Sequence, residues 1–143
     1  VPVSGRVDAI LISPEGEEYL VDIKTTNRRK MESLEYPDYE TLVQWILYSW
    51  LFSIQKGGII YEDRGMMPFP CTKIFDLKND DGSVDVFLNK VQTHREENLL
   101  QNSLKKMQEV YNCYIEQKHP PRCSKCLVSC EYRELCNSLD GFT

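Results

Sequence analysis

Two aspartates and a lysine near the start of the chain have the residue types and spacing of a site for a hard cation. Asp8 ends the run Gly5-Arg-Val-Asp, and Asp22 and Lys24 end the run Tyr19-Leu-Val-Asp-Ile-Lys. Because side chains in a strand alternate between two faces, Asp22 and Lys24 share a face. Carboxylates bind hard cations through oxygen, and an ammonium beside them stabilises negative charge. The pattern therefore favours metal-assisted chemistry, with a solvated, charged strand as the alternative interpretation.

Two apolar strands joined by a turn must position these groups. We expect strands over Val3 to Ile12 and Glu18 to Lys24, with the turn Ser13-Pro-Glu-Gly between them. Pairing of the strands brings Asp8 toward the face of Asp22. Both carboxylates would then lie in core elements, where burial is costly unless a cation or hydrogen bonds compensate for it.

A second pair of polar residues lies on one face of an apolar helix. The residues after Asp38, which suits a helix N-cap, predict a helix that runs to about Ile54 and is apolar on nearly every side. Such a helix is expected to be buried. Gln44 and Tyr48 are four residues apart and share a face. A glutamine there needs hydrogen-bond partners, so a satisfied core amide beside a tyrosine is one interpretation.

Outside these motifs the chain is expected to complete the sheet and add a second helix. Residues 27–38 read as a polar connection that begins with Arg28-Arg-Lys. Strands are expected at 59–61, 73–77 and 84–87, with Gly57-Gly58 ending the first helix and a tight turn at 79–82. A long amphipathic helix is expected from about Asn89 to Gln117. Its packed stripe comprises Leu100, Leu104, Met107, Tyr111 and Tyr114.

Four of the six cysteines lie within fourteen residues near the end of the chain: Cys123, Cys126, Cys130 and Cys136. Thiolates at this density suit a tetrahedral metal ion or an iron–sulfur cluster. A disulfide framework is the weaker interpretation, because Cys71 and Cys113 are scattered and nothing else indicates secretion. Such a centre would staple the tail to the core and take no direct part in the chemistry.

Composition places the chain among ordinary globular proteins. With 143 residues, 41% hydrophobic and 27% charged, it suits one domain with a real core. No apolar run reaches the length needed to span a bilayer, so we expect a cytoplasmic protein that does not bind a membrane. The net charge of −5 argues against a chain-wide basic surface for nucleic acid. It does not exclude a local one.

Three of these elements, in this order, resemble the motifs of the PD-(D/E)XK nucleases: Gly5-x-x-Asp8, Asp22-Ile-Lys-Thr-Thr26 and Gln44-x-x-x-Tyr48. The similarity is closest to the RecB-type branch, which includes the iron–sulfur nucleases of CRISPR adaptation and many phage exonucleases. The resemblance implies an α/β, restriction-endonuclease-like fold, a mixed sheet flanked by helices. Residues 1–118 would form the nuclease core and residues 119–143 the cysteine-rich tail. The relatives carry a helical segment with a further acidic residue or histidine, which would lie before Val1.

The resemblance further implies a metal-dependent DNA nuclease that hydrolyses phosphodiester bonds, as an exonuclease or on single strands. Asp8, Asp22 and the main-chain carbonyl of Ile23 would hold Mg²⁺ or Mn²⁺. Lys24 would lie beside the attacking water, orient it and stabilise negative charge.

Three further residues would serve the substrate. Gln44 would support the metal-site residues or the bound strand, Tyr48 would face the nucleic acid, and Thr25 would bond to a phosphate oxygen. The expected partners are DNA, as single strands or duplex ends, and proteins of a recombination, repair or CRISPR pathway. One alternative is a catalytically inactive nuclease-fold module that binds nucleic acid or a protein. Another is a zinc-stapled interaction domain.

The cysteines depart from the pattern of the iron–sulfur relatives, which have one cysteine before the core and C-x2-C-x5-C after it. Here Cys123-x2-Cys126 and Cys130-x5-Cys136 are both present but do not share a middle cysteine. The resemblance favours a [4Fe–4S] cluster, with Zn²⁺ as the alternative.

Overall fold

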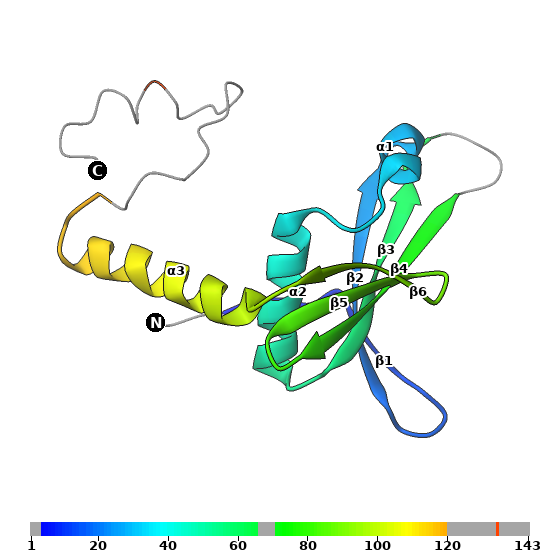
Figure 1. Cartoon of the computed structure of the whole chain (residues 1–143), viewed down its shortest axis with the longest axis horizontal. Helices are drawn as coiled ribbons and strands as arrows, with labels where there is room; N and C mark the ends of the chain where they lie inside the picture. The colour runs from blue at the N-terminus through cyan, green and yellow to red at the C-terminus, as the bar shows by residue number, and fades with distance from the viewer. Residues whose placement is uncertain (1–3, 66–70, 120–133, 135–143) are drawn as a thin grey trace. The chain divides into compact units, whose positions relative to one another are not determined.

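The computed structural model describes residues 4–65 and 71–119, together with Glu134. The chain divides into two units, with the division between Ser103 and Leu104. The first unit contains a six-stranded sheet whose strands follow one another in chain order (Figure 1). Its elements are β1 (Ala9–Ile12), β2 (Glu18–Thr26), α1 (Arg28–Ser33), α2 (Tyr39–Phe52), β3 (Lys56–Asp63), β4 (Thr72–Asp80), β5 (Ser83–Leu88) and β6 (Val91–Glu96). The helix α3 (Leu99–Ile115) begins in this unit and continues into the second.

The sheet is mixed because only β2 and β3 are parallel. The other neighbouring strands run antiparallel. A parallel pair needs a crossover, and α1 and α2 supply it. The register places Asp22 opposite Ile59 and Lys24 opposite Tyr61. This mixed sheet with helices agrees with the restriction-endonuclease-like α/β fold that the sequence predicts.

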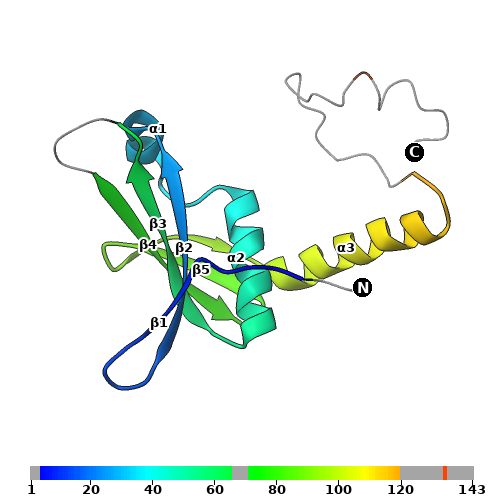
Figure 2. The same ribbon diagram turned by 180° about the vertical axis from the view of Figure 1, so that it is seen from behind.

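One face of the sheet is covered by α2, as Figure 2 shows. The indole N–H of Trp45 donates a 3.0 Å hydrogen bond to the carbonyl of Leu20, which fixes the helix to β2. The core between them includes Leu20, Leu42, Trp45, Ile46, Ile59, Tyr61 and Phe75. The opposite face of the sheet exposes Ile23 (45%) and Ile74 (51%).

The predicted all-round burial of the α2 helix is wrong. Trp50, Leu51 and Phe52 in its last turn are 44%, 39% and 43% exposed. The helix lies on one side of a sheet, so only the side facing the strands is covered. It ends at Ser53, which has a left-handed φ of 55°. Gly57 does not end it.

Gly57 and Gly58 lie inside β3, where the prediction placed a break between helix and strand. A Cβ at Gly57 would overlap the main chain of Leu20 on β2. The absence of a side chain therefore allows the two parallel strands to approach closely. Gly57, which the sequence suggested as the end of the helix, instead allows close packing of two strands.

The helix predicted from Asn89 to Gln117 is wrong in its first part, which forms β6. Asn89 and Lys90 have φ values of 51° and 66°, and positive φ at both positions of a two-residue turn is the geometry of a hairpin. They connect β5 to β6, and the helix starts only at Leu99. The polar connection predicted over 27–38 likewise contains α1, capped by the side chain of Asn27.

Part of the predicted packed stripe lies in the second unit. Within the described residues Leu104, Met107 and Tyr111 are half-buried, whereas Tyr114 is 77% exposed. The predicted cluster Cys123, Cys126, Cys130 and Cys136 lies outside the described residues. None of the helices in the described ranges is long and apolar enough to cross a membrane.

Candidate active site

The antiparallel pairing of β1 and β2 brings Asp8 and Asp22 together. Ala9 pairs with Val21, so Asp8, one residue earlier, lies beside Asp22. The Oδ2 of Asp8 accepts a 2.9 Å hydrogen bond from the main-chain N–H of Ile23. Asp22 is only 7% exposed. Asp8 is exposed, so its predicted place in a core strand is wrong: β1 begins at Ala9 and is the edge strand of the sheet.

The two carboxyl groups interact strongly enough to move their pKa values apart. Hydrogen bonds from the Asp22 carboxyl and from the Ile23 N–H lower the pKa of Asp8. Burial, and then the hydrogen bond with Asp8, raise the pKa of Asp22. Of the two adjacent carboxyls, Asp8 therefore loses its proton more readily than Asp22.

Lys24 completes the group of charges on the same face of β2. Its Nζ lies 3.1 Å from Oδ2 of Asp22. The angles are not those of a hydrogen bond, and this buried oxygen accepts none within the described part of the chain. The Nζ instead donates a 2.8 Å hydrogen bond to Oε1 of Gln44 on α2. The predicted shared face of Asp22 and Lys24 is therefore confirmed, with Ile23 on the other face.

Gln44 and Tyr48 extend this contact toward the start of the chain. The Nε2 of Gln44 donates to the hydroxyl of Tyr48 at 3.3 Å, and that hydroxyl accepts from the main-chain N–H of Arg6 at 3.4 Å. A Cβ at Gly5 would overlap the Tyr48 ring. The three sequence motifs thus form one connected set of contacts, and the amide of Gln44 is satisfied on both sides.

Two residues stand apart from the expectation. Thr25 is exposed and, by strand alternation, shares the face of Ile23, so the structure does not bring it to the carboxylates. Tyr61, to which the sequence assigned no role, is 3% exposed and lies opposite Lys24 on the neighbouring strand. Burial raises its pKa, with the charge of Asp22 a smaller contribution. No sequence signal marks Tyr61, because the parallel register alone places it there.

The oxygen atoms of this site fit a divalent cation whose remaining ligands are supplied by water or by the substrate. Asp8 and Asp22 offer carboxylate oxygens, one of them buried without a hydrogen-bond donor, and the Ile23 carbonyl is adjacent. No group of three or more His, Cys, Asp or Glu side chains able to hold a metal occurs in residues 4–65 and 71–119. Mg²⁺ is commonly bound by one or two carboxylates together with waters and phosphate oxygens. Two carboxylates therefore suffice.

Comparison with protein families gives one match. The model of the PD-(D/E)XK nuclease superfamily matches residues 1–137, which include all three motifs. Searches of curated proteins and of solved structures found no match.

Proposed function

Since this chain belongs to the PD-(D/E)XK nuclease superfamily, we propose that it is a metal-dependent nuclease that hydrolyses phosphodiester bonds of DNA. Members of the superfamily are typically nucleases, act on nucleic acid and usually use Mg²⁺ or Mn²⁺. The narrower proposal, action on strand ends or single strands, rests on the resemblance to RecB-type enzymes.

The observation that carries the proposal is the state of Asp22. Its side chain is 9% exposed, its Oδ2 accepts no hydrogen bond in the described part of the chain, and a second carboxyl lies beside it. The Lys24 ammonium, 3.1 Å from Oδ2 of Asp22, is the one cationic side chain paired with these two adjacent carboxyls in the described residues, so their negative charges are only partly compensated. A cation shared by Asp8 and Asp22 would compensate both.

Each residue then has a defined task. Asp8 and Asp22 would hold the cation, and the Ile23 N–H holds the carboxylate of Asp8 in place. When bound, Mg²⁺ or Mn²⁺ supplies Lewis-acid stabilisation of the phosphate and lowers the pKa of a bound water. The Lys24 ammonium, fixed by Gln44, stabilises negative charge that develops on the phosphate oxygens.

The direct test is cleavage by the purified full chain. Labelled single-stranded and duplex DNA are incubated with Mn²⁺, with Mg²⁺ or with EDTA, and we expect degradation only with metal. Asp22→Asn and Lys24→Ala should abolish it. The matched control is Asp85→Asn, because Asp85 is also a strand carboxylate paired to a basic side chain, at 2.7 Å from Arg95. Circular single strands would be spared by an exonuclease and cut by an endonuclease.

The outcomes separate the proposal from its alternative. Cleavage that survives Asp22→Asn would contradict the assigned site. DNA binding without cleavage under every metal condition would instead identify the chain as an inactive nuclease-fold module.

A further inference from the structure

We propose that Arg28, Arg29 and Arg64 form a second phosphate-binding site, here named the arginine site, which holds the substrate strand several nucleotides away from the scissile phosphate. This inference rests on the proposed function for the identity of the ligand, a nucleic-acid strand. The residues themselves lie outside the site of Asp8, Asp22 and Lys24.

The parallel strands bring these arginines to one end of the sheet. Arg28 and Arg29 begin α1, directly after β2, and Arg64 follows the last residue of β3. The N–H of Arg64 donates a 2.9 Å hydrogen bond to the carbonyl of Thr26, so the two strand ends are joined. Both ribbon views place α1 at the ends of β2 and β3 (Figures 1 and 2).

The spacing along β2 suits a strand of nucleic acid. Three residues lie between Lys24 and Arg28, and β2 ends at Thr26, so the strand rise sets an upper limit of about 13 Å on their Cα separation. Along the axis of a B-form duplex that length corresponds to at most roughly four nucleotides of one strand, and a more extended single strand spans it with fewer. A strand with its scissile phosphate at Lys24 that runs along β2 therefore places later phosphates at the arginine site.

Arg28 is oriented by a buried carboxylate. Its Nε lies 3.6 Å from Oδ2 of Asp63, whose side chain is 5% exposed. Asp63 is itself held by the N–H of Gly65 at 2.8 Å. The Nε atom is buried, yet 40% of the Arg28 side chain is exposed. One edge of the guanidinium is thus turned toward Asp63 and the remainder stays accessible, which is the presentation that suits a phosphate.

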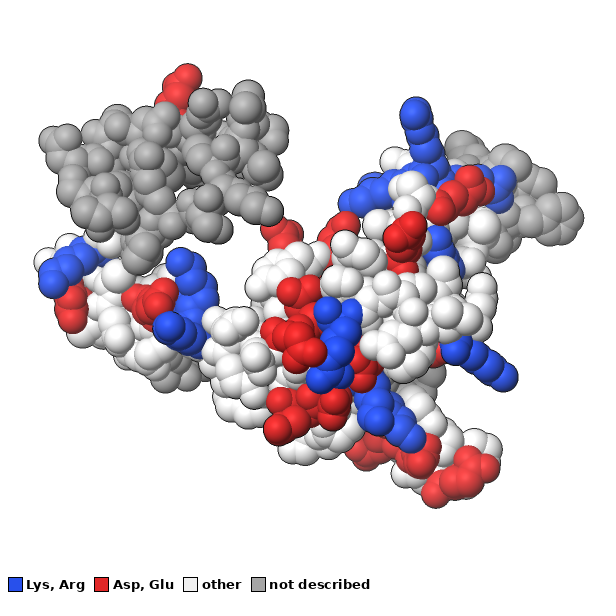
Figure 3. All heavy atoms as spheres, viewed as in Figure 1, with Lys and Arg blue, Asp and Glu red and all other residues white. Residues whose placement is uncertain are grey.

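Arg29 and Arg64 supply the uncompensated charge. Both are exposed, and neither has a carboxylate oxygen within 4.0 Å among the residues that the structure describes. Lys and Arg side chains lie over α1 in Figure 3, with acidic side chains between some of them. Carboxylates elsewhere in the first unit are engaged differently: Asp80, Asp85 and Glu97 all surround Arg95. At the arginine site itself, the printed acidic contacts are those of Glu32 and Asp63 with Arg28, which leaves the guanidinium groups of Arg29 and Arg64 without a carboxylate partner among the described residues.

Binding to a cleavage-inactive chain tests the arginine site without requiring activity. In the Asp22→Asn background, the affinity for a labelled single strand is measured by fluorescence anisotropy with Ca²⁺ over a range of salt concentrations. Each lost phosphate contact on a single strand lowers the salt slope by about 0.7. Arg29→Ala with Arg64→Ala should therefore weaken binding and reduce the slope by about 1.4. Since neither side chain has a carboxylate partner in the described residues, the unfolding temperature should stay unchanged.

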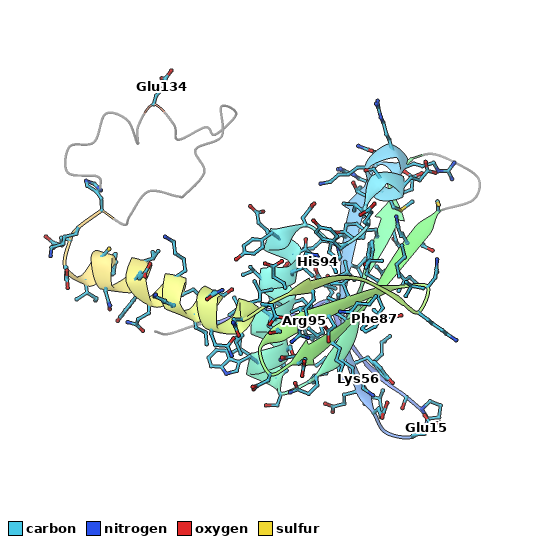
Figure 4. All side chains as sticks on the ribbon, viewed as in Figure 1. Glu15, Lys56, Phe87, His94, Arg95 and Glu134 are labelled. Carbon is cyan, nitrogen blue, oxygen red and sulfur yellow. The ribbon has the colours of Figure 1, made fainter. Side chains whose placement is uncertain are left out.

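The matched control is Lys56→Ala. Lys56 is 52% exposed, its Nζ lies 3.8 Å from Oε1 of Glu17, and it lies at the opposite end of the sheet from α1 (Figure 4). Its removal should leave affinity and slope unchanged. The arginine effect should also vanish with a dinucleotide, which is too short to reach from Lys24 to α1.

Three results would overturn the arginine site: an unchanged salt slope in the arginine variant, an equal loss in Lys56→Ala, or no DNA binding by the parent chain. The proposed function fails separately. If the chain never cleaves DNA, but affinity and salt slope fall in the arginine variant and not in Lys56→Ala, the arginine site is supported. The nuclease assignment is then wrong.

Discussion

The Nζ of Lys24 donates a 2.8 Å hydrogen bond to Oε1 of Gln44, which joins a side chain of β2 to one of α2 at the centre of the candidate site. The same ammonium lies 3.1 Å from Asp22. Lys24 is therefore held from two sides, and its position depends on a helix that is distant in sequence.

Gln44→Ala should lower cleavage without a comparable loss of DNA binding. Without the amide, Lys24 gains freedom and turns toward Asp22 alone. A misplaced charge of this kind costs about tenfold in rate, equivalent to about 1.4 kcal/mol. Single-turnover kinetics report the loss in the rate constant, and anisotropy reports binding. Gln101→Ala is the control, since Gln101 bonds to the carbonyl of Asp81, far from the three site motifs in sequence. An equal loss in both variants would contradict the positioning role.

Asp22→Asn should raise the stability of the metal-free protein at neutral pH while it removes cleavage. The pKa of Asp22 is raised by burial, so its favourable contribution is full below its unfolded pKa and is lost as pH rises through the folded value. At neutral pH the wild type carries the cost of a buried anion beside Asp8. We expect a gain of about 1 kcal/mol in the free energy of unfolding.

The gain should shrink as the pH falls through the folded pKa and vanish below the unfolded pKa, where Asp22 is protonated in both states. Asp8 has the opposite shift, and its stabilising contribution is lost at lower pH. Denaturant titrations with EDTA at several pH values measure both trends. A variant less stable than the wild type at neutral pH would contradict this account of Asp22.

Gly5→Ala should destabilise the protein through Tyr48. A Cβ at position 5 would overlap the Tyr48 ring, and overpacking of this kind costs about 1–3 kcal/mol. The loss should be smaller when Tyr48 is replaced by Leu, so a double-mutant cycle gives a coupling energy. Additive losses would show that the glycine is needed for another reason. Gly16→Ala is the contrasting case, with open space around the site but a φ of 86°.

The cysteine tail remains a prediction, because its residues lie outside those that the structure describes. Protein purified without oxygen should be brown and absorb visible light if Cys123, Cys126, Cys130 and Cys136 hold an iron–sulfur cluster. Colourless protein with stoichiometric zinc would replace that assignment with the alternative. In either case Cys130→Ser should lower the unfolding temperature and leave the cleavage rate of the folded protein nearly unchanged. Cys113→Ser should change neither quantity.

Prediction from sequence succeeded where the signal is local. The hairpin that carries Asp22, the helix that starts after Asp38, and the turn at Asp81 and Gly82 all follow from alternation, capping and turn residues. The boundaries failed where packing decided them. A periodic pattern beginning at Asn89 fits a helix, but pairing with β5 converts its first residues into β6.

The glycine pair at residues 57 and 58 shows the same limit. Read alone, it breaks a helix; in the sheet, Gly57 permits the close approach of β3 to the main chain of Leu20. A residue without a side chain serves either purpose, so only the neighbouring strand distinguishes them.

By itself the sequence determined which groups are available and which of them share a face, because strand and helix periodicities are properties of the local chain. It thereby determined the pair Asp22 and Lys24 and the pair Gln44 and Tyr48. Only the tertiary structure decided that the two pairs meet, that Asp8 reaches the Ile23 N–H from an exposed bend, and that Tyr61 lies beside them. These contacts join segments that are distant in sequence. Their geometry follows from strand register and helix packing, which the local pattern of a single segment does not specify.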